Sequence, residues 1–283
     1  AVYNKKRKMV WAYGNVHINK KDTLNLFCDS LRYDGREKMA KLKGNVRVRD
    51  QEYKLTTKEL DYDAEKGQAA YYTGGRVEGS KTREVLTSRV GYYYPESKNF
   101  AFSNNVVYEG NNMRMTTDTL QYMAYEQKAY FYGPTNIDAK NALMYCESGW
   151  YQTSTEEGRL SGNAWISRDS TYISGDTLLY LPKTGTYEGI GNVYYMDSTE
   201  NLVFTGNYAF ASDSMHYTLL TGDAIATKMM ENDTLNIHAD TLYNYKDDST
   251  NILKGYYGAA TYSTMFQSVC DSLVYDKEKE RIE

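Results

Sequence analysis

Short stretches in which apolar and polar residues alternate run along most of the chain. In one of them Val46 and Val48 share a face, and Arg47 and Arg49 share the other, which is the period of a β-strand with one buried side. Asp50–Gln51 follows and is typical of a tight turn, after which a second alternating stretch begins. This pattern predicts antiparallel hairpins.

The alternation in that second stretch slips by one position. Leu55 and Thr57 share a face, and so do Leu60 and Tyr62, but three residue steps separate Thr57 from Leu60. Such a slip turns every later side chain to the other face unless the strand bends or bulges. Gly44–Asn45 offers a matching bend on the opposing strand, so we expect each hairpin to be creased near its middle.

The same two stretches recur along the whole chain, which indicates a repeat protein. The apolar segment ending near a tyrosine recurs at Leu26–Tyr33, Leu55–Tyr62, Leu86–Tyr93, Met115–Tyr122, Met144–Tyr151, Ile173–Tyr180, Val203–Phe210, Ile237–Asn244 and Ser268–Tyr275. The Gly-Asn stretch recurs between them, at Gly14–Ile18, Gly44–Val48, Asn104–Tyr108, Gly162–Ile166, Gly191–Tyr195 and Gly222–Ala226. We therefore predict an all-β fold, a repetitive antiparallel β-jelly-roll or V-shaped stack of creased hairpins, with about nine repeats of ~30 residues.

Residues 1–283 are expected to form one such β-repeat array. Pro95 and Pro182 fall in predicted turns, and Pro134 lies beside Gly133 at a bend, away from positions where a strand needs its N–H. Both chain ends fall inside a repeat, so the chain is predicted to be a segment of a longer array. Its open strand edges would favour end-to-end pairing.

Composition supports a sheet and narrows the function. The 283 residues include 30 tyrosines and 3 prolines, and tyrosine favours strands. A formal net charge of −4 gives no electrostatic basis for binding nucleic acid. No Ser/His/Asp set and no spacing typical of metal ligands stands out, so no enzyme activity, cofactor or metal is expected.

The Gly-Asn-Val-x-[Val/Ile] strand and the following [Ala/Thr]-Asp-x-Leu-x-Tyr segment resemble the repeats of the OstA-like family of lipopolysaccharide-transport proteins. The resemblance covers nearly the whole chain. It implies a β-jelly-roll that holds lipid A acyl chains between its sheets and stacks into a bridge from inner to outer membrane. The chain has more repeats than the compact bridge protein of the family and an abundance of tyrosine, which leaves the lipid and the exact role open.

On this resemblance we predict a periplasmic conduit for lipopolysaccharide, with association with the outer membrane left open. Its expected partners are lipopolysaccharide or a related lipid and other β-jelly-roll proteins of the pathway, or a second copy, through edge-strand stacking. The alternative is a structural or protein-binding β-repeat array that acts by strand addition, without lipid transport. An enzyme acting on polysaccharide is the least favoured alternative, because it would need clustered carboxylates.

The inward apolar stripe is the predicted lipid groove, since each buried methylene of an acyl chain contributes about 0.8 kcal/mol without any polar anchor. Its members are Val16, Ile18, Leu31, Val46, Val48, Leu60, Val106, Leu120, Ile137, Ile166, Leu178, Val193 and Leu242. A dry core filled by these same side chains is the alternative that the sequence leaves equally open.

The cysteines and the recurring aspartates are interpreted as structural. Cys28, Cys146 and Cys270 hold one repeat position and lie roughly 38 Å apart by strand spacing, beyond the ~7 Å that a disulfide spans, so free buried thiols are predicted. The aspartates at the crease are expected to bond local backbone amides rather than to catalyse. They are Asp29, Asp118, Asp176, Asp240 and Asp271.

Overall fold

The computed structural model describes residues 1–20, 24–94, 96–110, 113–139, 142–181, 183–212, 214–247 and 250–283. Within these ranges the regular structure consists of 22 strands, and the pairings between them are antiparallel. The predicted all-β antiparallel fold is confirmed. No helix long and apolar enough to cross a membrane occurs in these ranges.

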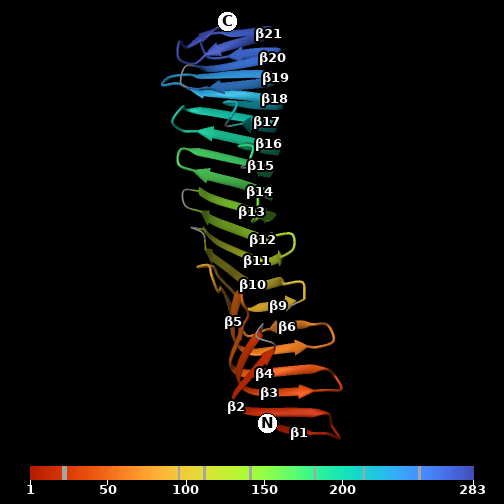
Figure 1. Cartoon of the computed structure of the whole chain (residues 1–283). Coiled ribbons are helices and arrows are strands. Elements are labelled where there is room, and N and C mark those ends of the chain that lie inside the picture. The colour runs from red at the N-terminus through yellow and green to blue at the C-terminus, as the bar shows by residue number, and fades with distance from the viewer. Residues whose placement is uncertain are drawn as a thin grey trace. The chain divides into compact units, whose positions relative to one another are not determined.

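The chain forms two compact units, Ala1–Lys140 and Asn141–Glu283. Unit 1 contains β1 (Val2–Asn4), β2 (Met9–Lys20), β3 (Leu24–Asp34), β4 (Met39–Arg49), β5 (Tyr53–Asp63), β6 (Gln68–Tyr71), β7 (Gly75–Gly79), β8 (Val85–Ser88), β9 (Val90–Tyr94), β10 (Asn99–Gly110), β11 (Met113–Met123) and β12 (Lys128–Ala139). Unit 2 contains β13 (Ala142–Gln152), β14 (Gly158–Arg168), β15 (Thr171–Leu181), β16 (Thr186–Asp197), β17 (Leu202–Ser212), β18 (Tyr217–Met229), β19 (Thr234–Lys246), β20 (Asn251–Tyr262), β21 (Gln267–Asp276) and β22 (Arg281–Ile282). Within each unit the long strands follow one another in chain order (Figure 1). That residues 1–283 form one array stays a prediction.

Four of the long strands, β2, β4, β14 and β16, are creased at a Gly-Asn pair. In the pairing of β2 with β3, Tyr13 lies opposite Ser30 and Val16 opposite Cys28, so Gly14–Asn15 face a single residue. Both bulged residues have left-handed backbone, with φ of +73° for Gly14 and +48° for Asn15. The same pair of angles recurs at 44–45, 162–163 and 191–192. Glycine and asparagine adopt this conformation most readily, and Asn104–Asn105 and Gly222–Asp223 take the place of the motif at the bulges of β10 and β18.

The predicted slip on the partner strand is also present. Thr57 and Leu60 are buried, and the two residues between them, Lys58 and Glu59, are both exposed. Two residues of β4 face one residue of β5 at this point, so the strands bend together. The crease predicted from the pattern is therefore confirmed in this hairpin.

A side chain on the preceding strand holds the bulge in place. Asn45 donates a hydrogen bond from Nδ2 to Asp29 Oδ2 at 2.8 Å, and Asn192 donates to both carboxylate oxygens of Asp176 at 3.1 and 3.2 Å. In another repeat Glu147 accepts the equivalent bond at 2.6 Å. These carboxylates have a structural role, as expected, but the bond comes from the asparagine side chain rather than from a backbone amide.

One hairpin of unit 1 departs from the repeat, because each of its two strands is interrupted. The first strand is divided into β6 and β7, and the second is divided into β8 and β9. Tyr71 fills the space at the break. Its side chain is only 3% exposed, and its hydroxyl lies 2.7 Å from Ser88 Oγ. A Cβ added at Gly75 or Gly91 would lie 2.4 Å from the Tyr71 ring. The two glycines therefore make room for this ring.

Of the prolines, Pro134 lies in the bulge of β12, between the residues that pair with β11. This agrees with its predicted place at a bend. Pro95 and Pro182, predicted to lie in turns, fall outside the described residues.

The three cysteines are free, but one departs from the prediction that all are buried. Cys28 and Cys146 are buried, whereas Cys270 is only partly buried because it lies beside the exposed stretch 267–269 of β21. Burial raises the pKa of Cys146 to about 11, so this thiol stays protonated and unreactive near neutral pH.

Candidate ligand-binding cavity

The two halves of the creased strands face each other in unit 1. Strand register places Phe100 in line with Tyr93, Ala69 and Tyr62, at the opposite end of β5 from Tyr53. An 11-residue strand would hold its ends roughly 33 Å apart if it were straight. The Tyr53 ring nevertheless meets the Phe100 ring edge-on, with 5.1 Å between centroids. The crease therefore folds unit 1 into two layers.

Between these layers lies an apolar cavity of about 260 Å³. Four of the predicted groove residues line it, namely Ile18, Leu31, Val48 and Leu60. Its other aliphatic walls come from Leu26, Ala40, Leu42, Leu55, Ala69 and Val77. Among the described residues that line it, only Asp50 is charged.

The remaining predicted groove residues lie outside this cavity wall. The buried ones are Val46, Val106, Leu120 and Ile137 in unit 1, and Leu178, Val193 and Leu242 in unit 2. Val16 and Ile166 are partly buried. Whether any of these residues contacts a ligand stays a prediction.

Aromatic side chains form the part of the wall that sequence reasoning missed. Phe100 stacks on Tyr93 with 4.6 Å between centroids and on Phe102 with 5.7 Å. Both phenylalanines line the cavity, together with Tyr71. The available signal was the alternation of Phe100 and Phe102 just before the degenerate copy Asn104–Tyr108.

Polar groups form one part of the rim. Asp50 Oδ1 accepts hydrogen bonds from the backbone N–H of Glu52 at 2.8 Å and of Tyr53 at 2.6 Å, and Asp50 Oδ2 accepts one from the Tyr93 hydroxyl at 3.3 Å. Burial raises the pKa of Tyr53 to about 12, and burial beside the Asp50 charge raises the pKa of Tyr93. Both phenols stay neutral at physiological pH, so the carboxylate of Asp50 is satisfied from within the protein.

The wall of the cavity is most exposed at β2. Ile18, which lines it, is 39% exposed, whereas Val48 at the same position of the next repeat is only partly exposed. One position earlier on the same face, Val16 is partly exposed while Val46 is fully buried. The inner face is therefore accessible at β2 and closed further along the unit.

The interior of unit 2 between β16 and β22 is filled by its own side chains. Phe204, Leu220, Ile237, Leu242 and Leu253 are all at most 1% exposed and belong to one buried cluster. Such dense packing of large aliphatic and aromatic groups makes a dry core. A cavity thus lies between the layers of unit 1, and a packed core lies in unit 2; whether the cavity binds lipid stays a prediction.

The chemistry of unit 1 is that of an apolar binding surface. In the described part of the chain, no group of three or more His, Cys, Asp or Glu side chains is arranged to hold a metal ion. The wall offers methyl groups, methylenes and ring faces, all of which favour a hydrocarbon ligand through burial of apolar surface.

Comparison with known proteins gives one family match and a distant structural similarity. Residues 1–118 match the family model described as OstA-like protein. LptH of Pseudomonas aeruginosa, described as the LptA homologous periplasmic component of the conserved lipopolysaccharide transport device, is 14% identical; the similarity covers 40% of this chain and 80% of that chain, with a TM-score of 0.37. No curated protein sequence matches the chain.

Proposed function

Because residues 1–118 match the family model of OstA-like proteins, we propose that the chain is a lipid-binding protein of lipopolysaccharide transport. It acts in the periplasm as a non-catalytic conduit between inner and outer membrane, and it holds the acyl chains of lipid A between its two layers. Its partners are lipopolysaccharide or a related lipid and, by strand addition, other β-jelly-roll proteins of the pathway or a second copy.

The observation that carries this proposal is the apolar cavity of unit 1. Its volume, about 260 Å³, exceeds the roughly 150 Å³ in which an apolar cavity holds benzene. It falls just below the ~300–1,000 Å³ of pockets that enclose drug-sized molecules. The cavity thus has room for one alkyl segment. At about 0.8 kcal/mol for each buried methylene, one such segment binds without a polar anchor.

Site-specific photo-crosslinking tests the proposal. A photoreactive residue at Val48, which lines the cavity, is compared with one at Arg47, the exposed neighbour whose side chain points away from it. In the protein purified from a Gram-negative host, mass spectrometry is expected to find a lipid adduct at Val48 and none at Arg47. A second probe at Ile166 reports whether lipid also reaches unit 2.

The filled core of unit 2 supports a second candidate function, a structural or protein-binding repeat array. An array of this kind needs no space between its layers. Absence of lipid at Val48, Leu60 and Leu55 in a correctly folded protein would favour it over transport. Protein adducts at the strand edges would then identify its partner.

A further inference from the structure

We propose that ion pairs between opposite ends of the creased strands are latches on the space between the layers, a weak latch at the unit 1 cavity and a strong one in unit 2. The weak latch is Glu52–Lys98, and the strong latch is Glu200 with Lys246 and Lys277. The role in admitting lipid rests on the proposed function, whereas the latches themselves rest on geometry alone.

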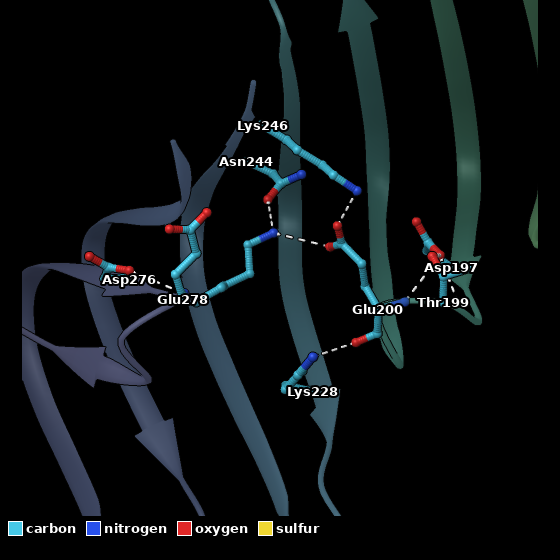
Figure 2. Close-up of polar contacts among 9 residues, drawn as sticks. Asp197, Thr199, Glu200, Lys228, Asn244, Lys246, Asp276 and Glu278 are labelled. Carbon is cyan, nitrogen blue, oxygen red and sulfur yellow. Dashed lines mark hydrogen bonds and ion pairs between the residues drawn. The ribbon is translucent and has the colours of Figure 1, made fainter. Parts of the chain in front are cut away.

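The strong latch is centred on one carboxylate (Figure 2). Glu200 lies in the turn between β16 and β17, and its Oε2 is 3.3 Å from Lys277 Nζ. Lys246 Nζ pairs with the other oxygen of the same carboxylate. Lys277 also donates to Asn244 Oδ1 at 2.7 Å, and Lys228 donates to the Glu200 carbonyl. The Glu200 carboxylate thus holds two lysines, and its backbone carbonyl holds a third.

Strand register shows that this latch joins opposite strand ends. Lys228, near the end of β18, pairs with Leu202, which directly follows the Glu200 turn. Tyr245, which directly precedes Lys246, pairs instead with Tyr217 at the other end of β18. The ion pairs therefore cross from one layer to the other and do not join neighbouring positions on paired strands.

The Glu200–Lys277 pair of the strong latch is shielded from water, whereas the Lys246 side chain is 54% exposed. The side chain of Lys277 is 4% exposed and that of Glu200 is 16% exposed. Burial alone would raise the pKa of Glu200, but the hydrogen bond from Lys246 and the charges of both lysines outweigh it, so that pKa lies below its ordinary value. Removing Glu200 leaves the buried Lys277 charge without a carboxylate, which is strongly unfavourable. This latch therefore holds unit 2 closed.

The weak latch has the same plan in unit 1. Lys98 Nζ lies 2.7 Å from Glu52 Oε1, and it joins the turn before β10 to the turn between β4 and β5, at the opposite strand ends. The Tyr93–Asp50 hydrogen bond crosses between the layers beside it and forms part of the cavity rim. About half of each latch side chain is exposed, and such pairs contribute little because solvent screens them.

The strength of each latch matches the interior behind it. The weak, solvated latch lies beside the hollow interior, and the strong, desolvated one lies beside the filled core. Opening the weak latch separates the layers of unit 1 and admits a chain from the side, whereas unit 2 stays shut. Lateral entry at unit 1 thus needs the loss of one exposed ion pair, one long hydrogen bond and the contact between the Tyr53 and Phe100 rings.

Charge reversal with spin-label distance measurement tests the weak latch in the full chain. Labels at Gln51→Cys and Glu96→Cys, with Cys28, Cys146 and Cys270 replaced by Ala, report the spacing of the two layers. Lys98→Glu is expected to lengthen and broaden that distance, and the swap Glu52→Lys with Lys98→Glu to restore it. The matched control is Lys38→Glu, since Lys38 occupies the same turn position but pairs with Glu65 at its own end of the strands.

Uptake of a fluorescent fatty acid is measured on the same variants. Lys98→Glu is expected to speed uptake about two- to fivefold, and the swap to return it to the original rate. An unchanged distance in Lys98→Glu, or an equal change in Lys38→Glu, overturns the latch. A lengthened distance with no uptake by any variant supports the latch and contradicts the proposed lipid binding, so the two claims fail separately.

Discussion

Single residues set the bend in each strand, and Gly44 shows the constraint most sharply. Its φ is +75°, and an added Cβ would lie 2.3 Å from Asp29 Oδ2, the oxygen that holds the neighbouring asparagine. Gly14 has nearly the same φ, +73°, but no atom lies within 4 Å of its added Cβ. Comparing Gly14 with Gly44 therefore separates the cost of backbone strain from the cost of crowding by Asp29.

Alanine at each position is expected to destabilise the fold by different amounts. Gly14→Ala should lower the free energy of unfolding by about 1–2 kcal/mol, the cost of a left-handed backbone with a Cβ. Gly44→Ala should lower it by a further 1–3 kcal/mol or so, because Asp29 must move. Urea unfolding measures both losses of unfolding free energy, and the slope of that free energy against urea concentration is expected to stay unchanged. Equal losses would show that the Asp29 contact carries no cost.

At the scale of the strand, burial of the inner face depends on the neighbouring repeats. Val46 and Val16 hold the same position after the Gly-Asn pair, yet Val46 is fully buried and Val16 is partly exposed. The difference arises because Val46 lies on β4, between β3 and β5, whereas Val16 pairs with β3 and lies beyond the residues of β2 that pair with β1.

Truncation of the two valines should reflect this difference. Val46→Ala is expected to cost about 1–3 kcal/mol of unfolding free energy, through lost burial and the space left behind. Val16→Ala should cost less than about 1 kcal/mol, because its side chain already meets water. Thermal or urea unfolding of both variants provides the comparison. A larger loss at Val16 would contradict the proposed accessibility of the inner face at β2.

The strands and their creases could be predicted because their causes are local. A period of two, the slip between Thr57 and Leu60, and the left-handed preference of Gly-Asn all act within a few residues. The break around Tyr71 could not be predicted, since that ring fits between Gly75 and Gly91, which are distant from each other in sequence. The aromatic wall and the Glu52–Lys98 pair were missed for the same reason, because they form only once the layers fold over.

Across a whole unit, the ion pairs between layers make stability depend on pH. The pKa of Glu200 is lowered in the folded protein from its ordinary value of 4.5. A carboxylate with a lowered folded-state pKa stabilises the fold fully above its unfolded pKa, and this contribution is lost as the pH falls through the folded-state value. Unit 2 should therefore lose stability in acid below about pH 4.5.

Glu200→Gln should remove this part of the acid sensitivity and cost about 3 kcal/mol at neutral pH, since Lys277 is left buried without its partner. Glu65→Gln, which breaks the exposed Lys38–Glu65 pair, should cost less than about 1 kcal/mol. Urea unfolding between pH 3 and 7, roughly the span over which carboxylates titrate, measures both. An acid dependence unaltered by Glu200→Gln would exclude this carboxylate as its source.

The hydrogen bond from a bulge asparagine to a carboxylate on the preceding strand has a consequence for how such proteins evolve. The bend at Asn45 is held by Asp29, and that at Asn192 by Asp176, so the parts that shape one hairpin lie within two adjoining strands. Duplication or deletion of a complete repeat would leave every other bend intact and change the reach of the protein in steps of about 10 Å. A gene encoding this fold can thus lengthen or shorten the protein by copying or deleting units, without redesigning any of them.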